Sequence, residues 1–481
     1  MFRRRILFCT AALLGSLSAI VVAEHPQQKS TASPNIVVVF IDDLGWADFS
    51  CFGNSDALTP NIDRLAAGGI RFEQFYVNSP ICSPSRVALS TGQYPARWGI
   101  TSYLDNRKTN EARGVENWLS TDAPTLARIL QANGYKTGHF GKWHMGGQRD
   151  VGDAPLITEY GFDTSLTNFE GLGPRILGLK DAYDGSEPRQ HAMGSQNLGR
   201  GEITWLDRSQ VTRAFTDAAI EFINEAQAEE RPFYLNLWPD DVHAPFFPPE
   251  EMRGDGTRRV LYHGVLETMD EQLGSLFNLI REDDRLRDNT LVLICSDNGP
   301  AQGAGSAGPF RGFKTHLFEG GIRSPLIAWA PGLIPEEKSG ALNTDSVFSS
   351  IDLVPSLLEI ARIGMPDGIE FDGEVLADVV TGRSNASRIQ PLFFRRPPDR
   401  DSFYGIEDCP DLAVRSGKWK LLCEYDGSDA MLFDLSVDAG EATDISGENS
   451  DIVQKLTSAV VEWHNALPQD NGATYRIDRQ R

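Results

Sequence analysis

The sequence predicts an α/β protein with a large mixed, mostly parallel sheet sandwiched by helices, followed by a smaller C-terminal subdomain. The first observation is an order of helical segment, apolar strand and polar loop that recurs through most of the chain. The second is that the apolar runs are continuous, as expected for strands buried on both faces. The third is a change after about residue 385 to short runs separated by Gly and Asp, which is typical of antiparallel strands.

The run "NIVVVFIDDLG" (35–45) is the first expected strand, and its apolar part stops at Asp42. Each of three further expected strands follows a segment with helical periodicity. They lie within "GYKTGHFGKWHMG" (134–146), "RPFYLNLWPDDVHAP" (231–245) and "NTLVLICSDNGP" (289–300). Because ligands collect at the carboxyl ends of such strands, the polar residues after each run are expected to share one crevice. These residues are Asp42, Asp43, Lys142, His144, His243, Asp297 and Asn298.

The C-terminal part is expected to be an α+β subdomain. The segment "DLAVRSGKWKLLCEYDGSDAMLFDLSVD" (411–438) alternates β-like runs with turns, and "DIVQKLTSAVVEWHNAL" (451–467) has the pattern of an amphipathic helix. We therefore predict three parts, which are a leader at 1–23, a catalytic domain at 24–385 and an antiparallel-sheet subdomain at 386–481.

The leader has the layout of a secretory signal peptide, with arginines at 3–5, the apolar run "ILFCTAALLGSLSAIVV" and a small residue, Ala23. Export to the periplasm or the extracellular space is the expectation, and no later run is apolar for long enough to span a membrane. The arginine-led leader, the acidity and the few cysteines fit a bacterial exported protein.

The net charge of the chain and its number of cysteines limit the classes of function that the protein can have. The formal net charge is −22, and removal of the three leader arginines makes the mature chain more negative. Such a field argues against nucleic acid or an anionic membrane as a partner. Of the six cysteines one leaves with the leader, so five remain, an odd number in an oxidising compartment. We expect one of them to have a special role.

Two of the expected strand ends carry only oxygen ligands, at Asp42 and Asp43 and at Asp297 and Asn298. Three potential carboxylates and an amide oxygen suit calcium or magnesium rather than zinc. Either pair alone would be read as an ordinary turn. Two such pairs at the ends of two buried strands favour a metal site.

The stretch "NSPICSPSRVALSTGQYP" (78–95) places Cys82 at the expected start of a helix, with Pro84 in the first turn and Arg86 one turn further on. A helix N-terminus favours negative charge, so it would stabilise a thiolate or a bound anion. The alternative is a buried structural cysteine or half of a disulfide.

The local pattern C-x-P-x-R followed by "STGQYP" resembles the signature of type I, formylglycine-dependent sulfatases. The resemblance extends over nearly the whole mature chain, and its closest likeness is to the arylsulfatase and N-acetylgalactosamine-6-sulfatase branch. It implies an alkaline-phosphatase-like fold. The similar segments, in the order of that family, include "VVVFIDDLGWADFSCFG", "TPNIDRLAAGGIRFEQFYV", "GYKTGHFGKWH", "DNGP", "GPFRGFKTHLFEGGIRSPLIAWAPG", "VRSGKWKLL" and "LFDLSVDAGEATDIS".

The resemblance implies that Cys82 is converted to formylglycine by a formylglycine-generating or sulfatase-maturating enzyme during biosynthesis. The hydrated aldehyde would then attack sulfur, and a second hydroxyl would drive the release of sulfate. One calcium ion would be held by Asp42, Asp43, Asp297, Asn298 and the modified Cys82.

The remaining roles follow from the same resemblance. Arg86 would steady the modified side chain, and His144 would act as its base. Lys142 and Lys314 would hold the sulfate oxygens, and His243 would approach the leaving oxygen. The expected activity is hydrolysis of sulfate esters, with exo-type removal of sulfate from a sugar in a sulfated polysaccharide. The loops at 102–118, 147–210 and 395–410 are expected to wall the pocket for the leaving group.

Two other functions stay open on the sequence. One is a phosphate or phosphonate ester hydrolase of the alkaline phosphatase superfamily, because sulfate and phosphate have a similar shape. The other is a non-catalytic binder of sulfated glycans. A cysteine hydrolase that uses Cys82 directly would leave the acidic ligand set without a purpose.

Overall fold

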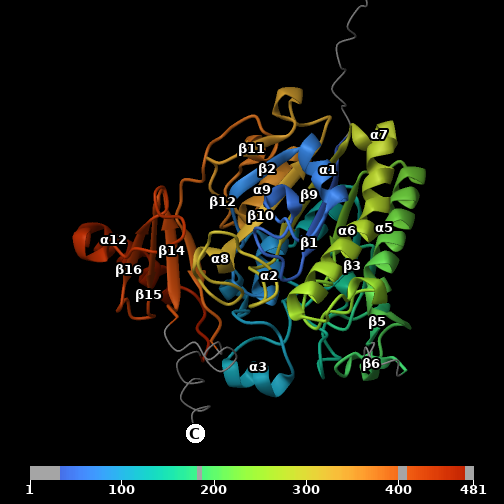
Figure 1. Cartoon of the computed structure of the whole chain (residues 1–481), viewed down its shortest axis with the longest axis horizontal. Helices are drawn as coiled ribbons and strands as arrows, with labels where there is room; N and C mark the ends of the chain where they lie inside the picture. Colours follow the sequence, from blue (N-terminus) through green and yellow to red (C-terminus); the bar gives the residue numbers. More distant parts are fainter. Residues whose placement is uncertain (1–32, 181–186, 399–408, 472–481) are drawn as a thin grey trace, which may run out of the picture. The chain divides into compact units, whose positions relative to one another are not determined.

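The central strand of the protein is β1 (Asn35–Ile41), in which all seven residues are buried. It pairs in parallel with β8 (Phe233–Trp238) on one side and with β9 (Thr290–Ser296) on the other. The strand is part of a computed structural model that describes residues 33–180, 187–398 and 409–471 (Figure 1). The expected leader at 1–23 and residues 399–408 of one expected loop lie outside the described residues.

The large sheet is mixed and mostly parallel, which confirms the predicted fold class. Its main departure from parallel order is β10, which pairs antiparallel with both of its neighbours. Two further strands pair off the main path, β12 (Phe348–Ser349) with β2 and β7 (Ile203–Asp207) with β5. The strand order is β11 (Ala341–Asn343), β2 (Ile70–Tyr76), β10 (Arg323–Trp329), β9, β1, β8, β3 (Lys136–Gly141), β4 (Thr164–Thr167), β5 (Arg175–Lys180) and β6 (Arg189–His191).

Helices cover both faces of this sheet, because successive side chains of a strand point to opposite sides. Val37 and Val39 pack with the layer of α1 (Pro60–Gly68), α5 (Val211–Ala228), α6 (Arg258–Glu282) and α7 (Asp284–Arg287). Helices α5 and α6 lie side by side in Figure 1. Ile36 and Val38 pack with the opposite layer, formed by α2 (Cys82–Thr91), α4 (Leu126–Ala132), α9 (Ser350–Ile360) and α10 (Ala377–Val380).

The described residues of the segment 147–210, which are 147–180 and 187–210, contain regular strands that the sequence did not suggest. The segment carries β4, β5, β6 and β7, which extend one side of the large sheet. These strands are three to six residues long, and several of their residues are partly exposed. Such strands lack the long apolar runs that mark the central ones, so the prediction of a loop was wrong where β4 to β7 lie. The expectation that this segment walls the pocket for the leaving group stays a prediction. The segment 102–118 contains a short helix, α3 (Arg107–Arg113).

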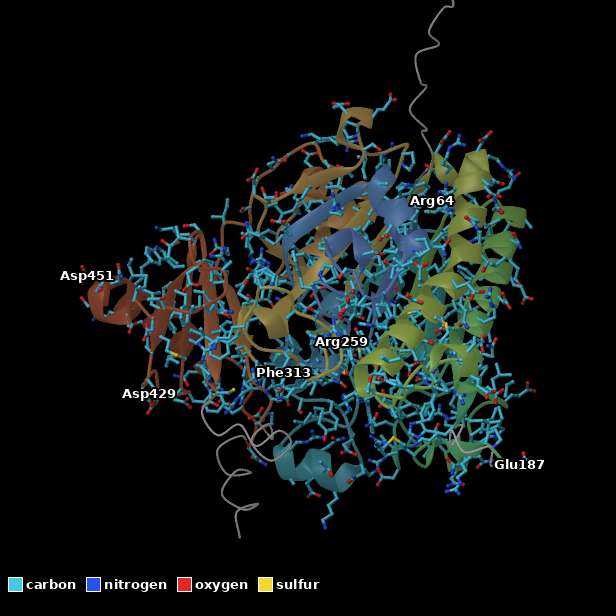
Figure 2. The ribbon with its side chains drawn as sticks, viewed as in Figure 1. Arg64, Glu187, Arg259, Phe313, Asp429 and Asp451 are labelled. Atoms are coloured by element: carbon cyan, nitrogen blue, oxygen red, sulfur yellow. The ribbon has the colours of Figure 1, made fainter. Side chains whose placement is uncertain are left out.

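The C-terminal part contains an antiparallel sheet and a helix, as predicted. One face of the sheet packs against α12 (Ser450–Asn465), whose first turn holds Asp451, labelled in Figure 2. The other face shares a buried apolar cluster with Tyr76 of β2 and with residues around α8 (Glu319–Ile322). The strands are β13 (Leu392–Arg395), β14 (Leu412–Ser416), β15 (Trp419–Cys423) and β16 (Met431–Asp434). The boundary at 385/386 stays a prediction.

No helix within the described residues is long and apolar enough to cross a membrane.

Candidate active site

The turn after β1 brings two adjacent carboxylates to the same place. Neighbouring side chains of a strand normally point to opposite faces, but Asp43 has φ 60, in the left-handed region that non-glycine residues rarely occupy. The amide of Asp43 donates a hydrogen bond to Oδ1 of Asp297 at 3.1 Å. His144, after β3, has φ 54. Uncommon backbone conformations of this kind concentrate at functional sites.

Helix α2 begins at Cys82, as predicted, and its first turn is buried. Arg86 lies one turn further on and is fully buried. Its Nη2 lies 2.7 Å from Oδ2 of Asp297 and 3.3 Å from Oδ1 of Asp42, and its Nη1 donates to the carbonyl of Lys142 at 2.9 Å. Arg86 therefore ties α2 to the ends of β1, β3 and β9.

Four of the predicted ligands form one cluster. Ligand atoms of Asp42, Asp43, Cys82 and Asp297 all lie within 4.8 Å of one another. Asn298 joins them, because its Nδ2 donates to Oδ1 of Asp43 at 2.9 Å.

This cluster fits a hard divalent cation. Oδ1 of Asp42 and Oδ1 of Asn298 are buried and accept no hydrogen bond from any residue that the structure describes. Buried oxygens without donors are costly, and a bound cation would satisfy them. The other donors are carboxylates, which are ligands that calcium prefers.

The close packing of charged groups shifts the pKa values of the acidic residues in this cluster. Burial, and after it the Asp42 carboxylate, raise the pKa of Asp297 to about 8. Burial also opposes ionisation of Asp42, but Lys142, His243 and Arg86 hold its pKa well below the usual value. A divalent cation between these groups would favour the ionised form of both.

Two lysines contact the carboxylates, one directly after β3 and one from the segment between β9 and α8. Nζ of Lys142 lies 2.6 Å from Oδ2 of Asp42, and Nζ of Lys314 lies 2.6 Å from Oδ1 of Asp43. Lys314 belongs to the segment between β9 and α8, next to Phe313, which is labelled in Figure 2. Although burial opposes their charge, the neighbouring carboxylates raise the pKa of both lysines. Both are therefore cations at neutral pH.

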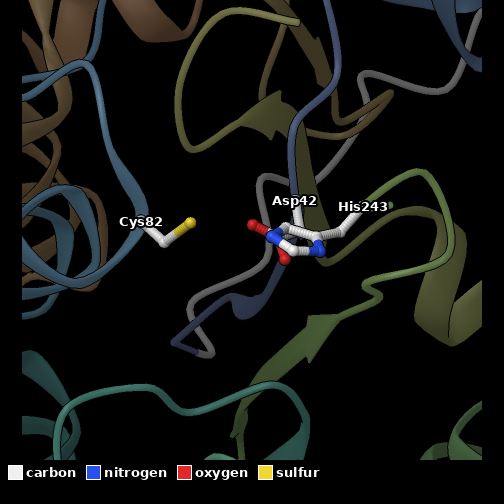
Figure 3. A group of neighbouring side chains, drawn as sticks. All are labelled: Asp42, Cys82 and His243. Carbon is white, nitrogen blue, oxygen red and sulfur yellow. The ribbon is translucent and has the colours of Figure 1, made fainter. Parts of the chain in front are cut away.

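His243 faces the cluster from the loop after β8. A ring nitrogen of His243, the carboxylate of Asp42 and Sγ of Cys82 lie within 4.8 Å of one another, and Figure 3 shows these side chains turned toward each other. Nδ1 donates to the carbonyl of Ala244 at 2.7 Å, so Nε2 is the nitrogen that faces Asp43, at 3.7 Å from Oδ2. The side chain is 37% exposed. It is thus reachable from outside.

His144 is buried, and a hydrogen bond fixes one of its ring nitrogens. Nε2 donates to the carbonyl of Leu104 at 2.9 Å, and Nδ1 lies 3.1 Å from Oε2 of Glu170. Burial lowers the pKa of His144 to about 3, against the opposing effect of the Glu170 carboxylate. The ring is therefore neutral near pH 7, with its lone pair on Nδ1.

Glu170 is a residue that the sequence did not single out. It follows the short strand β4 and is 4% exposed. Its Oε2 lies 3.0 Å from Nζ of Lys142 and 3.1 Å from Nδ1 of His144. Although burial opposes ionisation, His144 and Lys142 lower the pKa of Glu170 to about 2. Glu170 lies in a segment that was expected to be a loop, and no sequence pattern marks it as a functional residue. Its role depends on two side chains that precede it by more than twenty residues.

The expected stabilisation of a thiolate at Cys82 is not what the structure favours. Burial, and after it the Asp42 carboxylate, raise the pKa of the thiol well above its usual value. These effects outweigh the helix N-terminus and the two lysines. As encoded, Cys82 is a protonated and weak nucleophile.

Cations set around an acidic ligand cluster suit the hydrolysis of an ester that itself carries negative charge. The class of protein that the fold and the site define is therefore a hydrolase of anionic esters. Comparison with known proteins makes this more specific. A sulfatase family model matches residues 34–363, more than half of the chain.

Individual relatives agree with the family match. N-acetylgalactosamine-6-sulfatase of Canis lupus familiaris is 31% identical over 502 residues, covering 96% of this chain and 90% of the relative. Arylsulfatase A of Homo sapiens is 31% identical over 472 residues, covering 88% of this chain and 86% of the relative. A crystal structure of Ps i-CgsB in complex with k-i-k-neocarrahexaose superposes with a TM-score of 0.71 at 25% identity, covering 90% of this chain and 92% of that one.

The chain belongs to the sulfatase family, in its arylsulfatase and N-acetylgalactosamine-6-sulfatase-like branch, which confirms the resemblance. It is a sulfuric ester hydrolase of arylsulfatase-like type.

Proposed function

We propose that the protein hydrolyses sulfate esters with a formylglycine made from Cys82 and with one calcium ion. The observation that carries this proposal is the meeting of the Cys82 side chain with the carboxylates of Asp42, Asp43 and Asp297 at the start of α2. The high pKa of the encoded thiol supports a converted side chain rather than a thiolate.

The ligand set of this centre is Asp42, Asp43, Asp297, Asn298 and the modified Cys82. When bound there, calcium would supply positive charge that polarises the nucleophile and a sulfate oxygen. The hydrated aldehyde of the converted Cys82 would supply one hydroxyl for attack and a second for release of sulfate. Arg86 holds the start of α2 against Asp297 and thereby orients the converted side chain.

Lys142 and Lys314 bind the non-bridging oxygens of the sulfate group. Each ammonium contacts one of the two carboxylates after β1, so both are fixed before substrate arrives. A positioned cation stabilises negative charge in the transition state without having to reorganise. This electrostatic stabilisation is usually the largest contribution to the rate enhancement in such sites.

Two histidines carry the protons. His243 keeps one proton on Nδ1 for the carbonyl of Ala244, so Nε2 gives a proton to the leaving alkoxide only from the imidazolium form. Burial opposes that form, and the carboxylates of Asp43 and Asp42 favour it. His144 accepts a proton at Nδ1 from the converted Cys82, and Glu170 stabilises the imidazolium that results. The two rings have opposite tasks, since His144 accepts a proton and His243 donates one. Their surroundings also differ, because His144 is buried and His243 is partly exposed.

The substrate we propose is a sulfate ester on a sugar of a sulfated polysaccharide, removed in exo fashion. Support comes from the names of the relatives, several of which are N-acetylgalactosamine-6-sulfatases. We further propose that a formylglycine-generating or sulfatase-maturating enzyme acts on the chain during biosynthesis, and that the chain is exported with residues 1–23 as its signal peptide.

Rates on an aryl sulfate and on the matched aryl phosphate test this function directly. We expect kcat/KM to be higher for the sulfate by at least about 100-fold, a difference of about 3 kcal/mol in transition-state binding. A higher value for the phosphate would identify a phosphate or phosphonate hydrolase instead. No turnover of either ester by protein with converted Cys82, together with retained glycan binding, would identify a binder.

A further inference from the structure

A cavity of about 540 Å³ lies where β2 meets the C-terminal sheet. Its lining contains none of the metal ligands, lysines or histidines of the active site. Four cationic side chains line it, together with the two acidic residues Glu73 and Asp345. The cations are Arg323, Arg388, Arg415 and Lys418.

Three of the four cations are already paired. Arg388 contacts both carboxylate oxygens of Asp352, at 2.8 and 2.9 Å. Arg323 donates to Glu319 at 3.2 Å, and Lys418 lies 2.6 Å from Oδ2 of Asp434. Their charges are therefore balanced within the protein.

Arg415 is different. It is only 4% exposed, and its Nη2 donates to the side-chain oxygen of Gln74 at 3.2 Å. Its Nε and Nη1 are buried and have no acceptor, and the guanidinium forms no ion pair with any residue that the structure describes. A guanidinium carries five N–H donors and does not lose its proton, so this arrangement is costly unless an acceptor is supplied.

The neighbouring strand makes the imbalance larger. Arg415 on β14 pairs in register with Lys420 on β15, which places two like charges opposite each other. Lys420 is balanced by two buried carboxylates, Glu319 at 2.9 Å and Glu441 at 2.8 Å. The second oxygen of Glu319 accepts from Tyr76 and Arg323. Both carboxylates of this cluster accept from other donors, and Arg415 acts on Glu319 through its charge. The three cations of the cluster, Arg323, Arg415 and Lys420, outnumber its two carboxylates.

The acidic residues of the lining do not remove that charge. Asp345 accepts hydrogen bonds from Asn385 and Thr344, and Glu73 gives its backbone carbonyl to Arg323. Neither forms an ion pair with Arg415 among the described contacts. A guanidinium without an ion pair, lining a cavity in which cationic side chains outnumber acidic ones, suits the binding of an anion.

We propose that this cavity is a second ligand site, separate from the active site, that binds an oxyanion group through the guanidinium of Arg415. The chemistry shared by its possible ligands is a sulfate or carboxylate group. Such a group can be a free ion or part of an acidic sugar chain, and a cavity of about 540 Å³ has room for a sugar residue attached to it. This inference does not depend on the identity of the catalytic nucleophile.

Selenate, a sulfate analogue with a strong anomalous signal, is the direct probe. We expect crystals of the full chain soaked in selenate to show an anomalous peak within hydrogen-bond distance of the Arg415 guanidinium. The peak should be absent in Arg415→Met and present in Arg285→Met, a control that removes an exposed arginine from α7. No peak in the wild-type cavity, at a concentration that fills the active site, would overturn the proposal even if Arg415→Met does not fold.

Titration calorimetry distinguishes the two sources of the ligand. Inorganic sulfate and a disaccharide that carries a sulfate or a uronate are each titrated into the wild type and into Arg415→Met. For each ligand, we expect the wild type to bind one more molecule per chain than the variant does. An affinity at that site at least tenfold higher for the disaccharide identifies an acidic sugar as the ligand, and equal affinities identify the free ion. Equal site numbers in the two proteins for both ligands would contradict the site.

Discussion

Nδ1 of His144 lies 3.1 Å from Oε2 of Glu170, a pairing of a neutral imidazole with a carboxylate whose pKa is lowered to about 2. The carboxylate stabilises the imidazolium that forms when His144 accepts a proton, and it also holds Lys142 at 3.0 Å. Glu170→Gln keeps the shape and removes the charge. We expect kcat/KM on an aryl sulfate to fall by about 10- to 100-fold, the usual effect of removing a partner that orients a functional group.

The matched control for this change is Glu462→Gln, which removes an exposed carboxylate from α12. It should leave kcat/KM unchanged. If Glu170→Gln were as active as the control, with the same pH profile as the wild type, the carboxylate would have no part in orienting His144.

The two lysines should contribute separately to binding of the sulfate group. Lys142→Ala and Lys314→Ala are each expected to lower kcat/KM by about 100- to 1000-fold, because each removes one positioned cation from the developing charge. Steady-state kinetics with an aryl sulfate measures this. Lys108→Ala, at an exposed position of α3, is the control. A loss below about threefold in either active-site variant would exclude that lysine from the sulfate site.

Removal of divalent cations should inactivate the enzyme and lower its Tm. Without a cation, nothing offsets the repulsion that opposes ionisation of Asp297 beside Asp42, and the side-chain oxygen of Asn298 has no donor among the described residues. We expect EGTA to abolish turnover and added calcium to restore it. Calcium should not restore an Asp297→Asn variant at the same concentration. Full activity after exhaustive chelation, with the metal content checked by mass spectrometry, would rule out a metal-dependent site.

Asp48, in the loop after β1, should make the free energy of unfolding decrease as the pH rises from about 4 to 6. This buried carboxylate accepts from Gly45, Ser306 and Tyr262, and burial raises its pKa to about 6. Between about pH 4 and pH 6 the folded protein holds a proton here that the unfolded chain has released. The contribution of Asp48 to stability is therefore present below about pH 4 and is lost as the pH rises to 6, by up to about 3 kcal/mol.

Guanidinium unfolding from pH 4 to pH 7 measures this effect as the difference between the wild type and Asp48→Asn. The variant has no titrating group at this position, so the wild type should lose stability relative to it across the window. A difference in the free energy of unfolding that is constant with pH would show that Asp48 does not titrate there.

Much of the fold could be predicted because its central strands are long and uniformly apolar. The run at 35–45 shows where β1 ends, and the proline after Cys82 shows where α2 begins. The same logic placed Asp42 and Asp297 at one edge of the sheet, since both follow central parallel strands. The edge strands β4 to β7 are short and partly exposed, so no periodic signal marks them.

Some features of the sites depend on contacts between residues that are far apart in the sequence, and no local sequence pattern predicts these contacts. Glu170 acts on residues of another loop, and the excess charge of Arg415 becomes visible only through its register with Lys420. The direction of the pKa shift at Cys82 is a similar case. The helix start predicts a stabilised thiolate, but burial of the thiol and, after it, the Asp42 carboxylate, both known only from the structure, raise its pKa instead.

The central claim is that the catalytic nucleophile is a converted Cys82, and intact-peptide mass spectrometry combined with activity tests it most directly. Samples made with and without a co-expressed maturation enzyme should differ in the fraction of Cys82 that has lost its thiol and become an aldehyde. We predict that kcat on an aryl sulfate rises in proportion to that fraction and is zero for Cys82→Ala. Full activity in a sample whose Cys82 is entirely thiol would contradict the account.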